Sequence, residues 1–168
     1  MTITQTKLPS FTQAKKQVTG EEYRRYLQEL RLVDITLEEI RCSGDRSIIS
    51  PDMPSLSVEI QRTFKCQGTE TLRPALLLEY VIQGDQGETK IIQLRATYRI
   101  HFEVSTPLPS EFFTIYSNVS ADMQTWPFLR ELASSITGRM GVPRLVLPLL
   151  LDARSLDKRK RSSVPETD

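Results

Sequence analysis

The chain is predicted to adopt an α+β fold, in which a long C-terminal helix packs on one face of a four-stranded antiparallel sheet. Three segments alternate apolar and polar residues, with the period of two that is typical of strands with one buried face, and another predicted strand, residues 75–82, is more apolar on both faces. After them, apolar residues recur with the helical period at positions 126, 129, 133, 136 and 140. At 168 residues, the chain has the length of one ordinary domain.

The elements before the sheet are a flexible segment and a helix. Residues 1–19 are polar and aperiodic, and we expect them to lack regular structure. Thr19 can cap a helix that runs to Leu30, because two glutamates stand in its first turn, where the helix dipole favours carboxylates. We place a single domain at residues 20–156 and a flexible basic tail at residues 157–168.

The four predicted strands cover residues 33–38, 56–61, 75–82 and 92–104, and the last of them alternates most strictly. The connections between the second, third and fourth strands are short, and one of them is the turn at residues 84–87. Short connections favour an antiparallel meander, because parallel strands need longer crossovers.

The long helix is expected to follow a short connecting helix. Pro127 is placed in its first turn, where the missing N–H costs nothing, with Asp122 or Thr125 as the N-cap. Gly138 and Gly141 mark the end of the helix, since glycine tolerates the left-handed backbone that closes a helix.

Residues 145–151 form an apolar segment that contains Pro148 and no polar residue. Apolar surface of that density has to be covered by the same chain, by another subunit or by a bound protein.

The order of motifs from this helix onward resembles the SecB protein-export chaperones. An aromatic–Pro–aromatic–x–Arg–Glu motif opens the helix, a Gly–Arg pair closes it, and Pro-x-Leu-x-Leu and Asp–Ala motifs follow. In this chain they are Trp126–Glu131, Gly138–Arg139, Pro143–Leu147 and Asp152–Ala153. Pattern-level similarity extends the resemblance to about residues 31–156. The alternative is a core helix and a buried loop in another small fold.

The resemblance implies an ATP-independent chaperone, a holdase, that binds unfolded or preprotein chains in exposed apolar grooves. At roughly 25 cal/mol per Å² of apolar area removed from water, many weak contacts along a groove add up without sequence specificity. The family assembles as a homotetramer, a dimer of dimers. The implied client-binding residues are Leu56, Val58, Ile60, Leu145, Leu147, Leu149, Leu150 and Leu151.

The alternative for each of these residues is an ordinary place in the hydrophobic core, with no role in client binding. If Leu56 and Leu147 line a groove, changing both to aspartate should lower client binding and leave the fold intact. If both are core, the same change should unfold the protein. The alternative function is a scaffold or oligomerisation domain that binds no client.

The exporting members of the family use an acidic sheet face to engage the SecA motor. Asp34 and Glu38 match that face, but Leu94 or Arg95 stands where a further glutamate is expected. The tail is basic, and a helix that the exporters lack precedes the first strand. These departures bring the chain closer to the SecB-like chaperones of toxin–antitoxin systems, whose clients are antitoxins.

Other functional classes find little support in the sequence. His101 is the only histidine, and Cys42 and Cys66 have neither metal-ligand nor CxxC spacing. No phosphate-binding loop is present, so we expect no catalysis, cofactor or metal. A net charge of +1 gives no field that would recruit nucleic acid. No segment has the length of a membrane span or the pattern of a secretory signal, so we expect a cytoplasmic protein.

Overall fold

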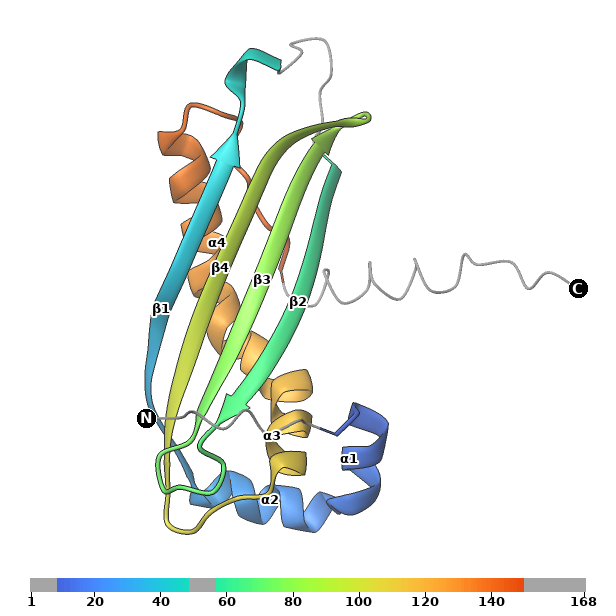
Figure 1. Ribbon diagram of the computed structural model, residues 1–168, viewed down its shortest axis with the longest axis vertical. Coiled ribbons are helices and arrows are strands. Elements are labelled where there is room, and N and C mark those ends of the chain that lie inside the picture. Colours follow the sequence, from blue (N-terminus) through green and yellow to red (C-terminus); the bar gives the residue numbers. More distant parts are fainter. Residues whose placement is uncertain (1–8, 49–56, 150–168) are drawn as a thin grey trace, which may run out of the picture. The chain divides into compact units, whose positions relative to one another are not determined.

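The structure, a computed structural model, describes residues 9–48 and 57–149. It divides into two compact units, residues 1–121 and residues 122–168. The first unit contains a four-stranded antiparallel sheet and the second contains the long C-terminal helix (Figure 1). The predicted fold class is therefore confirmed.

The strands are β1 (Leu30–Gly44), β2 (Ser57–Gln67), β3 (Ala75–Gln86) and β4 (Thr89–Val104). Their order in the sheet is β1-β4-β3-β2, so the predicted meander of β2, β3 and β4 is confirmed and β1 pairs with β4 (Figure 1). The β3–β4 turn lies two to three residues later than predicted, because the ladder continues until Gln86 pairs with Thr89. Gly87, with φ of 63°, makes this tight turn possible.

The core of the first unit lies on one face of the sheet. Strand β4 alternates as predicted, and the register places the apolar residues of β3 on the same face. Residues of this face that are at most 1% exposed are Leu76, Leu78, Tyr80, Ile82, Ile92, Leu94, Ala96, Ile100 and Phe102.

The N-terminal segment contains a helix, so the prediction that residues 1–19 lack regular structure is wrong for part of them. Helix α1 (Phe11–Gln17) begins with a capping box, in which the Ser10 hydroxyl accepts from the Gln13 amide and the Gln13 side chain accepts from the Ser10 amide. A small apolar cluster holds the helix in place, and its buried members are Ala14, Val18 and Ile115.

Helix α2 (Gly20–Glu29) is capped by Thr19, as predicted, through a capping box with Glu22. Helix α3 (Ser110–Tyr116) lies beside both N-terminal helices at one end of the sheet (Figure 1). The Phe112 ring contacts Tyr23 at a centroid distance of 5.4 Å, and Tyr116 contacts Phe102 of β4 at 5.4 Å. Aromatic contacts thus join α3 to α2 on one side and to the sheet on the other.

The long helix, α4 (Asp122–Arg139), begins before its predicted first turn, so Pro127 is its sixth residue. Neither Asp122 nor Thr125 serves as an N-cap, because a π-helical turn at Ser117–Ala121 leads from α3 directly into α4. Gly141, with φ of 71°, follows the helix and ends it as predicted.

Candidate client-binding surfaces

The apolar face of the sheet continues onto the edge strand β1. Each of two irregularities in the β1–β4 pairing inserts one extra residue, Val33 after Leu32 and Glu38 after Leu37. Because each extra residue shifts the alternation by one position, an irregular sequence keeps its apolar residues on one face. The residues of β1 that lie opposite the apolar face of β4 are Leu30, Leu32, Ile35, Leu37, Ile40 and Cys42.

Four apolar residues of β1 are exposed, and we call them the β1 apolar strip: Leu32, Val33, Leu37 and Ile40, with exposed fractions of 42, 54, 43 and 37%. The sequence predicted a half-buried strand here with Val33, Ile35 and Leu37 on one face. The bulge removes Val33 from that face, and no sequence pattern indicated that the strip would be exposed. Sequence reasoning therefore missed these four residues as candidates for binding.

The second edge strand, β2, is exposed at one end. On its apolar face, Cys66 is buried, Phe64 and Ile60 are half-buried, and Val58 is 38% exposed. Val58 and Ile60 are thus accessible, as the predicted groove requires. Leu56, the next predicted groove residue, lies outside the described residues.

In the second unit, the chain returns along α4 after Gly141. We call residues 142–149 the strap. Three side chains of α4 hold its backbone: Thr137 Oγ1 accepts from the Leu145 amide (3.0 Å), Arg130 Nε donates to the Leu147 carbonyl (2.9 Å), and Trp126 Nε1 donates to the Pro148 carbonyl (3.0 Å). The strap therefore runs antiparallel to α4. Of these three side chains, Trp126 and Arg130 belong to the motif that opens the helix in the sequence analysis.

Within the strap, the buried side chains of Leu145 and Leu147 flank the exposed side chain of Val146, as in an extended segment. Leu145 and Leu147 are 3% and 1% exposed, whereas Val146 and Leu149 are 70% and 59% exposed. The expectation that Leu145 and Leu147 are partly exposed groove residues is thus wrong for the structure as it stands. Leu149 is accessible as expected. The remaining predicted residues, Leu150 and Leu151, lie outside the described part of the chain.

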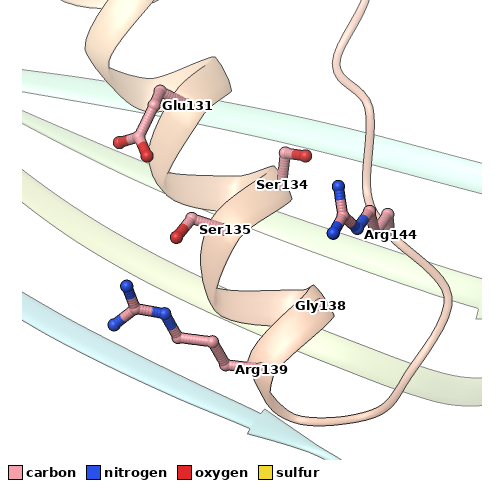
Figure 2. Close-up of a pocket in the computed structure, with 6 residues that line it drawn as sticks. All are labelled: Glu131, Ser134, Ser135, Gly138, Arg139 and Arg144. Atoms are coloured by element: carbon pink, nitrogen blue, oxygen red, sulfur yellow. The ribbon is translucent and has the colours of Figure 1, made fainter.

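An open pocket lies where the strap begins (Figure 2). The side chain of Arg144 lies over Gly138, where an added Cβ would come within 3.1 Å of Arg144 Nε. A side chain at position 138 would therefore require the Arg144 side chain to shift. Arg139 and Arg144 also place two cations near the C-terminal carbonyl groups of α4, where positive charge is favourable. The pocket is lined by Glu131, Ser134, Ser135, Gly138, Arg139 and Arg144.

The opposite face of the sheet is polar and carries the two predicted acidic residues. Asp34 is exposed, and its carboxylate accepts from the Ile35 amide. Glu38 forms an ion pair with Arg99, whose Nε lies 2.8 Å from Glu38 Oε1, and this hydrogen bond lowers the pKa of the Glu38 carboxyl. Further carboxylate–arginine pairs on the sheet are Glu39–Arg41, Glu79–Arg95, Glu103–Arg31 and Glu103–Arg73.

The Glu38–Arg99 pair predicts how stability depends on pH. Because the pKa of Glu38 is lower in the folded state, the pair stabilises the fold above the carboxyl's ordinary value of 4.5 and is lost as pH falls through the folded value. Wild type should therefore be more stable than Glu38→Gln at pH 7, and the two should converge in acid. Urea midpoints from pH 3 to 7 test this, with Glu88→Gln in the β3–β4 turn as control. A difference that persists unchanged at pH 3 would contradict the prediction.

The described residues offer few groups for catalysis. His101 is half-buried, with Nε2 lying 3.3 Å from Thr36 Oγ1. Burial raises the pKa of the Cys66 thiol to about 12. Within residues 9–48 and 57–149, no group of three or more His, Cys, Asp or Glu residues is placed to hold a metal ion. In the same part of the chain, no helix has the length and apolarity needed to cross a membrane.

Neither protein-family models nor curated protein sequences match this chain. Among solved structures, the fold is similar to that of the Mycobacterium tuberculosis SecB-like chaperone Rv1957, solved in complex with a ChAD peptide from the HigA1 antitoxin. The TM-score is 0.65 at 16% sequence identity, and the match covers 76% of this chain and 95% of that chain. A Streptococcus agalactiae protein of unknown function matches over 72% of this chain and 98% of its own, at 12% identity and a TM-score of 0.40.

Proposed function

We propose that this chain, whose fold is that of the SecB-like chaperones, is an ATP-independent holdase for unfolded polypeptides. The observation that carries the proposal is that the apolar face of the sheet stays accessible at the edge strand β2, where Val58 is exposed and Ile60 is half-buried. A protein that kept this face only as a core would cover it. Accessible apolar strips can instead bind many different unfolded chains, because apolar burial requires no particular sequence.

The preferred client is an aggregation-prone partner such as an antitoxin, and SecA is the less favoured partner. The solved neighbour binds an antitoxin peptide. The polar sheet face also argues against binding by SecA, which engages acidic side chains, since Glu38, Glu79 and Glu103 are paired with arginines. Neutralisation of these three carboxylates weakens the field that this face could present to a basic partner.

Suppression of aggregation tests the holdase function. The purified protein, without ATP, should reduce light scattering by a chemically unfolded model enzyme that is diluted into buffer. Val58→Asp should weaken this activity, because an apolar client segment would have to desolvate the new charge. Ser57→Asp, an exposed change on the other face of β2, is the matched control and should keep full activity. A wild-type protein without any effect on scattering would favour the scaffold function.

The β1 apolar strip also predicts assembly into a tetramer, a dimer of dimers. Edge strands with exposed apolar residues attract partners, and we place one subunit contact at β1. Wild type should sediment as a tetramer at micromolar concentration. Leu37→Glu combined with Ile40→Glu should weaken this contact by about 2–4 kcal/mol, the range of interface hot spots. Ser43→Glu, on the polar face of β1, is the control. A stable wild-type monomer would refute this assembly.

A further inference from the structure

The strap lies on α4 in the manner of a bound peptide. Each of its three hydrogen bonds to α4 uses a backbone atom of the strap, the Leu145 amide or the carbonyl of Leu147 or Pro148. The α4 groups that bind them, on Trp126, Arg130 and Thr137, are side chains. Recognition of this kind depends on an extended backbone and does not depend on the identity of the strap's side chains.

The apolar contacts of the strap also require little of its sequence. Leu145 and Leu147 are buried on either side of the exposed Val146, whereas Leu149, two residues further on, is exposed. An extended segment with apolar residues at two alternate positions would satisfy the same site. Unfolded clients present such segments frequently, because any former strand with one buried face alternates in this way.

We propose that the side of α4 that holds the strap is a second client-binding groove, which the chain's own strap occupies until an extended client segment replaces it. The inference rests on the proposed holdase function and extends it, since it adds a site in the C-terminal unit to the accessible strips of the sheet. The client backbone would accept hydrogen bonds from Trp126 and Arg130 and donate one to Thr137. Two alternate apolar side chains of the client would take the places of Leu145 and Leu147.

Occupation by the strap has a defined energetic role. The strap is covalently attached to α4 through the turn after Arg139, so its effective concentration at the groove is high. A client must compete with it, and its apparent affinity falls by the fraction of time during which the groove is free. The strap therefore keeps apolar surface covered when clients are scarce. It also limits uptake to segments that match an extended apolar chain at least as well as the strap does.

A reversible crosslink tests the exchange. An ideal Cβ at Gly138 lies 3.5 Å from Arg144 Cγ, which is close to the distances that a disulfide spans. Gly138→Cys with Arg144→Cys should therefore form a disulfide that fixes the strap on α4 one residue before Leu145. Cys42, which is half-exposed, is changed to Ser to prevent mispairing, and Cys66 is kept because its buried thiol stays protonated.

The probe is a fluorescein-labelled peptide with the sequence of residues 142–149, VPRLVLPL. Its binding is measured by fluorescence anisotropy for the oxidised and the reduced protein, beside a Gly138→Ser, Arg144→Ser control that cannot crosslink. We expect the oxidised protein to bind the peptide at least tenfold more weakly than the reduced protein, and a thiol reductant to restore binding. The control should bind equally well with and without oxidant.

If the oxidised and reduced proteins bind the peptide equally, or if the reduced protein does not bind it, then the peptide does not replace the strap on α4 and the proposal is refuted. Suppression of aggregation, measured on the same samples, separates the two proposals. A reduced protein that suppresses aggregation but fails either peptide criterion refutes the α4 groove and leaves the holdase function standing. A reduced protein that neither binds the peptide nor suppresses aggregation refutes both.

Discussion

Changing Leu147 to aspartate is expected to release the strap from α4 and to lower the stability of the C-terminal unit by about 4 kcal/mol or more. The side chain is 1% exposed, and an unpaired charge at a buried site belongs to the few changes with effects of that size. The intrinsic emission of Trp126 reports the release, because its indole N–H donates to the Pro148 carbonyl. The emission should shift to longer wavelength, and the urea midpoint should fall.

The neighbouring residue supplies the control for this change. Val146 is 70% exposed, so Val146→Asp adds the same charge one position earlier and should alter stability by no more than about 0.5 kcal/mol. Equal effects of the two changes would show that the strap is not docked as described. An unchanged midpoint for Leu147→Asp would restore the sequence-based assignment, in which Leu147 lines an open groove.

The second large effect is expected at Trp126, which the sequence pattern placed at a buried position and which is 6% exposed. Trp126→Ala should lower stability by about 3–5 kcal/mol, because it removes a large buried ring. Trp126→Phe keeps most of the apolar area but loses the hydrogen bond to Pro148, at a cost of about 1 kcal/mol.

Phe128 is the matched control for Trp126. It is an aromatic residue of the same helix turn, but it is 52% exposed. Phe128→Ala should therefore have a small effect on the chemical denaturation midpoint. Comparable losses at Phe128 and Trp126 would mean that burial does not distinguish the two positions and would contradict the placement of Trp126.

Much of the architecture could be predicted because it depends on local patterns. The strict alternation of β4 fixes which of its faces is apolar, and the capping box at Thr19 fixes the start of α2. The short connections between β2, β3 and β4 predict that these strands form an antiparallel meander. Helix α1 was missed, although Ser10 and Gln13 form a capping box, because its apolar residues are too few for a periodic signal and are buried against residues of α2 and α3.

The binding surfaces were less predictable because exposure depends on contacts between distant segments. Leu147 lies in a run without polar residues and Val58 lies in an alternating run, and both were assigned to the same client groove. One is buried and the other is 38% exposed, because the strap docks on α4 while β2 lies at a sheet edge. The sequence pattern also could not predict which residues of β1 share a face, because the bulges become visible only in the pairing of β1 with β4.

The two bulges of β1 limit how far another strand could add to this exposed edge and begin an open-ended fibril. A flat strand can add to another strand along its whole length, and repeated addition gives cross-β stacks. The bulges at Val33 and Glu38 divide the regular pairing of β1 with β4 into three stretches, Leu30–Leu32, Asp34–Leu37 and Glu39–Gly44. An arriving strand without matching bulges would lose register after a few residues, whereas a second β1 carries the same irregularities. The edge thus favours a closed, symmetric pairing of identical subunits over indefinite templating by unrelated chains.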